Sequence, residues 1–214
     1  MKNFIFDLDG TLSDPYLGIT NSIIYALKKM GIEPPPREEL KPFIGPPLSV
    51  SFKGIFRMTD KESEKAVKCY REYFGVQGLF ENELFDGIEN LLKRLKANNK
   101  RIYLATSKPE EYATRILEKF DILKYFDFVA GNTLKEERET KEAVLSYLLN
   151  KENLLRSESV MVGDRKYDII AAKEFSLKSV GVDFGFAAEG ELKIAGADFI
   201  VSSVAELENL LLSL

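Results

Sequence analysis

Short apolar segments alternate with amphipathic helical segments along most of the chain, and this alternation constrains the fold more than any other feature. Six apolar segments, rich in β-branched and aromatic residues, have the character of strands: Asn3–Phe6, Arg101–Ala105, Phe126–Ala130, Ser159–Val162, Ser179–Val182 and Asp198–Val201. The segments with helical periodicity are Gly87–Asn98, Pro109–Phe120, Lys141–Asn150, Asp168–Phe175 and Val204–Leu212. Because strands separated by helices form parallel pairs, the sequence predicts a doubly wound α/β sheet.

One region, residues 15–82, interrupts this alternation. It shows helical patterns and no strand, with apolar residues on single helical faces at Ile19, Ile23, Leu27 and Met30 and again at Ala66, Val67, Tyr70, Tyr73 and Phe74. We therefore predict an all-helical cap domain at 15–82, inserted into a core made of residues 1–14 and 83–214. The alternative is an ordinary long helical connection.

Composition narrows the possible partners and compartment. The chain has 214 residues and a formal net charge of -4, which argues against nucleic acid as a partner. No apolar run approaches the ~20 residues that span a bilayer. The start, Met1-Lys2-Asn3, lacks a signal-peptide pattern, and the single Cys69 permits no internal disulfide. We expect a cytoplasmic monomer or homodimer that binds neither membrane nor nucleic acid.

The chain contains no histidine. This excludes triads, general bases and metal sites that depend on imidazole. Carboxylates are then the charged ligands available to a metal, and they favour a hard ion such as Mg²⁺.

Polar side chains follow three of the predicted strands. Asp7 and Asp9 follow the first, Thr106, Ser107 and Lys108 follow the second, and Asp164 and Asp168 follow the fourth. Ligands of an open parallel sheet bind beyond the carboxyl ends of its strands, so these residues should share one edge. Two neighbouring carboxylates suit phosphoryl transfer, because one attacks phosphorus, the other handles a proton, and a divalent ion offsets their charge.

The segment Asp7-Leu8-Asp9-Gly10-Thr11 resembles the first motif of the haloacid dehalogenase-like phosphatases. The resemblance extends over nearly the whole chain and is greatest to the phosphoglycolate phosphatase-like group, whose helical cap follows this motif. It implies that Asp7 is the nucleophile, forms an aspartyl-phosphate and is also a ligand of the Mg²⁺ ion. Asp9 would act as general acid and base and bind Mg²⁺ through its backbone carbonyl. Gly10 would bring backbone N–H groups near the phosphate, and Thr11 would brace the loop.

Thr106 resembles the second motif, a hydroxyl that donates to the substrate phosphate, and the following Ser107 and Lys108 would help to hold phosphate. Alternatively, Thr106 or Ser107 caps the next helix, and Lys108 is a solvated surface residue.

Asp164 and Asp168 resemble the fourth motif, which holds Mg²⁺. Asp164 would bind directly, and Asp168 would bind directly or through water, or would serve as an acid at a helix N-terminus. The third-motif lysine is assigned to Lys141, although Glu142 stands where many relatives have proline; Lys135 and Arg138 lie nearby, and a surface lysine is the alternative.

The resemblance implies an Mg²⁺-dependent hydrolase of small phosphate monoesters, such as phosphoglycolate-like compounds, nucleotides or sugar phosphates. Asp9 favours phosphate esters over dehalogenation, because halide displacement needs no proton donor. Two alternatives use the same acidic segment: a phosphomutase of the β-phosphoglucomutase kind, and a non-catalytic switch that carries a phosphorylated aspartate.

Overall fold

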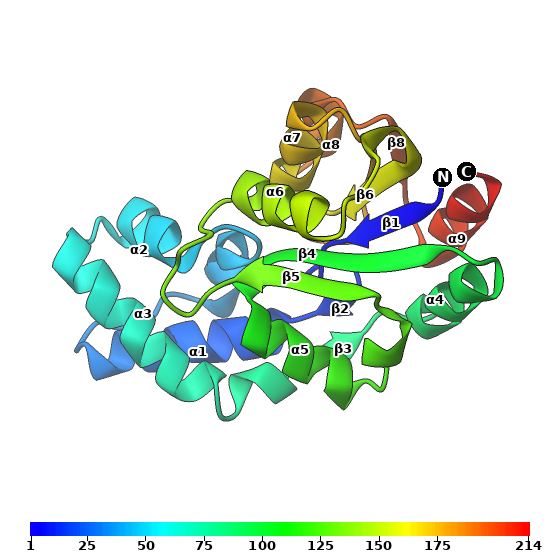
Figure 1. The fold of residues 1–214 in the computed structure, drawn as a ribbon. Helices are drawn as coiled ribbons and strands as arrows, with labels where there is room; N and C mark the ends of the chain where they lie inside the picture. The colour runs from blue at the N-terminus through cyan, green and yellow to red at the C-terminus, as the bar shows by residue number, and fades with distance from the viewer. The chain divides into compact units, whose positions relative to one another are not determined.

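The computed structural model describes residues 1–214, which divide into two compact units (Figure 1). Unit 1 contains Met1–Asp14 and Leu84–Leu214, and unit 2 contains Pro15–Glu83. The roles of these units as catalytic core and cap stay predictions. No helix combines the length and the apolar character that crossing a membrane would require.

Unit 1 is built on a six-stranded parallel sheet with the order β5-β4-β1-β6-β7-β8. The strands are β1 (Asn3–Phe6), β4 (Arg101–Pro109), β5 (Phe128–Asn132), β6 (Ser159–Gly163), β7 (Lys178–Val182) and β8 (Phe199–Val201). All six strands coincide with or overlap the predicted segments, so the predicted doubly wound α/β class is confirmed. The central strand β1 is buried along its whole length, as expected of a parallel strand covered on both faces.

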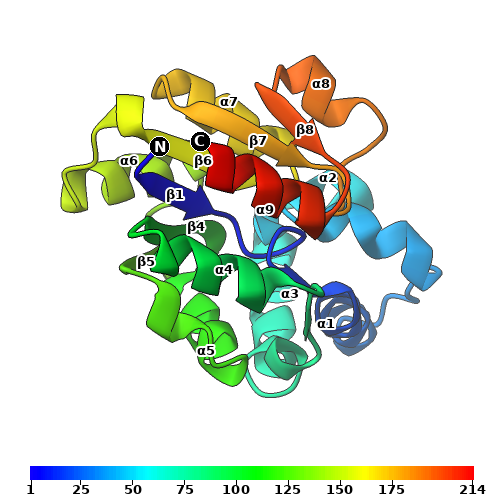
Figure 2. The same cartoon turned by 90° about the vertical axis from the view of Figure 1, so that its right-hand side faces the viewer.

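Helices cover both faces of this sheet (Figure 2). One face carries α4 (Ile88–Ala97), α5 (Glu110–Lys119) and α9 (Val204–Ser213), and the other carries α6 (Lys141–Lys151) and α7 (Lys166–Glu174). The short helix α8 (Glu191–Ala195) packs against α7, and two 3₁₀ turns, η3 (Leu123–Tyr125) and η4 (Arg156–Glu158), join other elements. The core beneath α6 and α7 is mostly aliphatic and includes Val144, Leu148 and Met161.

Two elements of unit 1 differ from the predicted ranges. Strand β4 continues to Pro109, four residues beyond the apolar run, and its pairing with β5 is irregular between Thr106 and Pro109. Strand β5 begins and ends two residues later than predicted, since Phe126 closes the preceding turn by donating its N–H to the carbonyl of Leu123.

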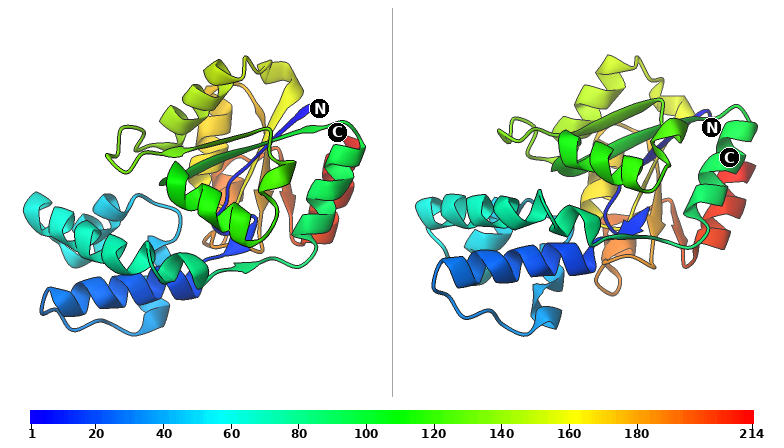
Figure 3. Two further views of the ribbon diagram at one scale, coloured as in Figure 1. Left: turned by 60° about the horizontal axis from the view of Figure 1, so that its bottom comes forward. Right: turned by 90° about the horizontal axis from the view of Figure 1, so that it is seen from below.

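Unit 2 is helical, in agreement with its sequence pattern. It contains α1 (Tyr16–Lys29), η1 (Arg37–Phe43), α2 (Leu48–Phe56), α3 (Asp60–Phe74) and η2 (Gly78–Phe80). Helices α1 and α3 lie side by side, and α2 packs on α3 (Figure 3). The start of α3 is fixed by a capping box, in which the Thr59 and Glu62 side chains accept each other's backbone N–H. Just outside these helices in sequence, the short strands β2 (Ser13–Asp14, in unit 1) and β3 (Glu83–Leu84) form a two-stranded sheet that the sequence pattern does not predict.

Candidate active site

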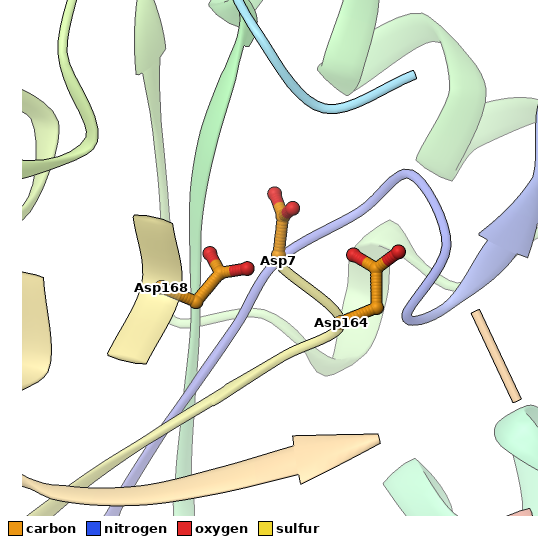
Figure 4. A group of neighbouring side chains, drawn as sticks. All are labelled: Asp7, Asp164 and Asp168. Carbon is orange, nitrogen blue, oxygen red and sulfur yellow. The ribbon is translucent and has the colours of Figure 1, made fainter. Parts of the chain in front are cut away.

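Three buried aspartates meet at the carboxyl edge of the central sheet. Asp7 follows β1, and Asp164 follows β6, whose Val162 is level with Phe6 of β1. Asp168 lies in the first turn of α7. One carboxylate oxygen from each residue lies within 4.8 Å of the others, and the three side chains converge on one space (Figure 4). The predicted convergence of strand ends is therefore present for these acids.

Lys141 lies between two of these acids. Its Nζ is 2.8 Å from Asp7 Oδ1 and 2.8 Å from Asp168 Oδ1, and it donates to the carbonyl of Ala105 at 3.0 Å. Lys141 is the first residue of α6, and Thr140 caps this helix by accepting the N–H of Ala143. The lysine is buried, so the surface alternative for Lys141 is wrong.

The two other cations considered for this position lie elsewhere. Lys135 is exposed. Arg138 donates to the carbonyl of Gly131 and to Glu110.

Backbone N–H groups orient the two acids that follow β6. The N–H of Arg165 donates to Asp168 Oδ2 at 3.1 Å, so Asp168 does serve as an acid at the start of α7 while its other oxygen contacts Lys141. Asp164 accepts the N–H of Phe186 at Oδ2, 2.8 Å away, and Thr11 Oγ1 is 3.5 Å from its Oδ1. Both carboxyl groups are fully buried.

The three acids carry more negative charge than Lys141 offsets. Burial raises the pKa of Asp164 well above its ordinary value, and the neighbouring Asp168 and Asp7 raise it further. Burial also raises the pKa of Asp168 to about 6, although Lys141 opposes this effect. Burial alone would lower the pKa of Lys141, but Asp168 and Asp7 outweigh it and raise that pKa. With three carboxylates ionised and one ammonium, the cluster has a net charge of -2.

These residues fit a small divalent cation. Oxygens bound to one Mg²⁺ at ~2.1 Å lie at most ~4.2 Å apart, so the observed spread closes with small side-chain movements. A charge of +2 would neutralise the cluster, and hard carboxylate oxygens are the ligands that Mg²⁺ prefers. Asp7, Asp164 and Asp168 are therefore suited to hold it. Asp9 is predicted to bind the ion through its backbone carbonyl, and its side chain is not part of this carboxylate cluster.

Asp9 forms a second ion pair beside the cluster. Lys108 Nζ is 2.8 Å from Asp9 Oδ2, and only 9% of Lys108 is exposed, so the solvated-surface alternative for Lys108 is wrong. The other oxygen of Asp9, Oδ1, is buried and accepts no hydrogen bond. Burial raises the pKa of Asp9, and Lys108 partly opposes the shift. Asp9 thus retains a proton more readily than an ordinary aspartate and has one oxygen free to use it.

Thr106 is buried on the extension of β4, where its Oγ1 accepts the N–H of Lys108 at 3.3 Å. Helix α5 begins at Glu110 with Pro109 as its N-cap, and no side chain caps it. The alternative that Thr106 or Ser107 caps this helix is therefore wrong. Ser107 is half-buried and has no hydrogen bond to the acids.

Gly10 and Thr11 form the turn after the first acids. Gly10 has a φ of 80°, a region that favours glycine, and a Cβ here would overlap the Asp164 carboxylate. Its N–H donates to the carbonyl of Ser13 at 2.8 Å and so closes the turn. The Thr11 hydroxyl donates to Asp164 Oδ1, 3.5 Å away.

The loop after β7, residues 183–187, was not among the predicted site residues. This loop supplies the Phe186 N–H to Asp164. Ligands of a parallel sheet bind beyond the carboxyl ends of its strands, and the segment Asp183-Phe184-Gly185 directly follows β7. The same rule could therefore have indicated this loop.

Comparison with known proteins agrees with this geometry. The family model for haloacid dehalogenase-like hydrolases matches residues 4–182. A 5'-nucleotidase from Pseudomonas aeruginosa is 38% identical over 98% of this chain and 95% of its own length. A phosphoglycolate phosphatase from Vibrio parahaemolyticus is 27% identical over 97% of this chain and 94% of its own. The crystal structure of a predicted phosphatase from Clostridium acetobutylicum matches with a TM-score of 0.96 and 42% identity, covering 100% of this chain and 99% of that one. The chain accordingly belongs to the haloacid dehalogenase-like hydrolases, within which it is a phosphatase.

Proposed function

We propose that this protein hydrolyses small-molecule phosphate monoesters with Mg²⁺ through an aspartyl-phosphate on Asp7. The observation that carries the proposal is the difference in environment between the two acids after β1. Asp7 lies in the carboxylate cluster with Lys141, whereas Asp9 pairs with Lys108 and has a raised pKa. A nucleophile and a proton donor need such different environments.

Asp7 attacks the phosphorus atom with a carboxylate oxygen, and the bond between phosphorus and the leaving oxygen breaks. Asp9 gives its proton to that oxygen, so the alcohol leaves neutral. Water then attacks the phosphorus of the aspartyl-phosphate and loses its proton to Asp9, which releases inorganic phosphate and restores both carboxyl groups. Lys141 remains beside Asp7 Oδ1 throughout and offsets its charge.

Asp7, Asp164 and Asp168 would hold the Mg²⁺ ion, which supplies electrostatic stabilisation to the phosphoryl oxygens when it is bound. The Thr106 hydroxyl and the Ser107 hydroxyl, both on the extension of β4, would donate to these oxygens. Gly10 and Thr11 keep the connecting turn in place.

The names of the relatives support a proposal for the substrate class. Proteins similar to this chain are named 5'-nucleotidase and phosphoglycolate phosphatase. We infer that the substrate is a nucleotide, a phosphoglycolate-like compound or a sugar phosphate. We also infer that unit 2, an inserted helical unit, acts as the cap that selects among them.

The test replaces Asp7 with asparagine, which preserves size and removes the nucleophilic charge. We expect the Asp7→Asn variant to lose turnover of p-nitrophenyl phosphate in Mg²⁺ while its circular dichroism and melting temperature show a folded protein. Wild-type protein in chelator should lose activity and regain it with Mg²⁺. Retained turnover in the variant would exclude Asp7 as nucleophile. Phosphate release measured across nucleotides, phosphoglycolate and sugar phosphates then identifies the substrate, and an isomerised sugar phosphate without free phosphate would indicate a mutase.

A further inference from the structure

The loop after β7, residues 183–187, contacts the carboxylate of Asp164, one of the proposed metal ligands. We call these residues the β7 loop. The N–H of Phe186 donates to Asp164 Oδ2 at 2.8 Å, whereas the only other hydrogen bond to this carboxylate, from Thr11 Oγ1, is 3.5 Å long. The single short hydrogen bond that orients Asp164 therefore comes from the backbone of the β7 loop.

Gly185 lets the loop approach so closely. A Cβ on Gly185 would overlap the Asp164 side chain and the carbonyl oxygen of Gly10. The φ of Gly185 is not positive, so the position needs glycine for space rather than for backbone conformation. Gly10, Asp164 and Gly185 therefore pack so closely that a methyl group on either glycine would not fit.

The first two residues of the loop are anchored. Asp183 donates its N–H to the carbonyl of Val201 at 2.8 Å. The ring of Phe184 packs edge-on against Phe85, with centroids 5.3 Å apart. Backbone pairing and ring packing thus fix the position from which Phe186 reaches Asp164.

Glu191, the first residue of α8, ties the loop to the segment that carries Asp164. Its Oε2 accepts the N–H of Ala188, directly after the loop, at 3.1 Å. Its Oε1 accepts the Arg165 Nε–H at 3.0 Å and the Lys166 N–H at 2.8 Å, and these two residues directly follow Asp164. One carboxylate therefore holds both sides of the Phe186–Asp164 hydrogen bond together.

We propose that the β7 loop and Glu191 are positioning elements of the divalent-cation site: they fix the Asp164 carboxylate and so determine how tightly the ion binds. The inference rests on the proposed function, since it assumes that Asp164 is a ligand. Partners that orient a metal ligand commonly contribute 10–100-fold to metal affinity. The residues given this role, the β7 loop and Glu191, lie outside the carboxylate cluster itself.

The experiment titrates Mg²⁺ into metal-free protein by isothermal calorimetry for the wild type and for the Gly185→Ala and Glu191→Ala variants. We expect about 10–100-fold weaker Mg²⁺ binding in Gly185→Ala and about 10-fold weaker binding in Glu191→Ala. The Mg²⁺ concentration that half-activates p-nitrophenyl phosphate hydrolysis should rise in parallel, with KM for the substrate at saturating Mg²⁺ unchanged.

The matched control is Gly54→Ala on α2, where a Cβ meets nothing within 4 Å, and we expect wild-type affinity. Circular dichroism and melting in chelator establish that each variant is folded, and Glu191→Ala carries the test if Gly185→Ala does not fold. Unchanged Mg²⁺ affinity in the folded variants, with normal binding by the wild type, would overturn the loop inference alone. A wild type that neither binds Mg²⁺ nor needs it would overturn both this inference and the metal-dependent function.

Discussion

Replacing Lys141 with methionine should reveal how much the buried charges depend on this lysine. Methionine fills similar space but leaves Asp7 and Asp168 without the ammonium that lies 2.8 Å from each. Removing one partner of a buried ion pair costs about 3–5 kcal/mol, because the remaining charge stays buried and unpaired. For a chain of this size, that cost corresponds to a decrease in melting temperature of about 6–20 °C.

The loss of stability in Lys141→Met should also depend on pH. The Asp168 pKa of about 6 lies above the ordinary 3.8, so the folded protein binds this proton more tightly than the unfolded chain does. The contribution of Asp168 to stability is therefore greatest below about pH 4 and falls as the pH rises towards 6. Because Lys141 lowers this pKa, the variant's Asp168 should titrate at higher pH. The deficit of the variant relative to the wild type should then be largest near neutral pH and become smaller towards pH 5.

Urea denaturation of both proteins in chelator at pH 5 and pH 7 measures this deficit. Lys2→Met is the control: Lys2 pairs with Glu158 at 2.7 Å, but 70% of its side chain is exposed. An exposed pair contributes less than about 1 kcal/mol, so the control should resemble the wild type. If Lys141→Met is as stable as wild type at neutral pH, or its deficit grows as the pH falls, the charge argument is wrong.

Two more substitutions test separate parts of the site. Asp164→Asn removes a buried charge next to two like charges, so in chelator the melting temperature of the variant should exceed that of wild type. The increase in melting temperature that Mg²⁺ gives the wild type should be lost. Differential scanning fluorimetry with and without Mg²⁺ measures both effects, and a lower melting temperature in chelator would contradict the reasoning. Lys108→Met removes the cation that lowers the pKa of Asp9, so the pH profile of kcat should shift to higher pH. A profile that stays in place or moves to lower pH would show that Lys108 does not control the protonation of Asp9.

Periodicity was sufficient to predict the sheet, since buried parallel strands are nearly continuous apolar runs. It was insufficient where tertiary pairing extends a strand into residues of low β-propensity. Thr106 pairs with Gly131 and Pro109 with Asn132, so β4 and β5 both continue through glycine or proline. Such pairing depends on the neighbouring strand, and local sequence carries no sign of it.

The acids and lysines of the site were identifiable because their residue types indicate their chemistry. The acid that Lys108 faces was not identifiable. Lys108 was predicted to help hold phosphate, with a solvated surface position as the alternative. The structure buries Lys108 and pairs it with Asp9, and its contact with phosphate stays a prediction. Lys108 lies on the part of β4 that extends beyond the predicted segment, so its position in the strand was itself unpredicted.

The contribution of the β7 loop to the site was not predicted from the sequence for a different reason. Phe186 acts through a backbone N–H, which every residue except proline possesses, and Gly185 acts through the space left by an absent side chain. Neither property is visible in a search for reactive residue types. Glu191 is visible as a residue type, but its importance comes from three hydrogen bonds. Two of them reach Arg165 and Lys166, more than twenty residues away in sequence, and the third reaches the nearby Ala188. An acidic site of this kind therefore depends on two sets of residues: those whose charges face the ion, which sequence can indicate, and those that hold the charges in place, which only the packed chain defines.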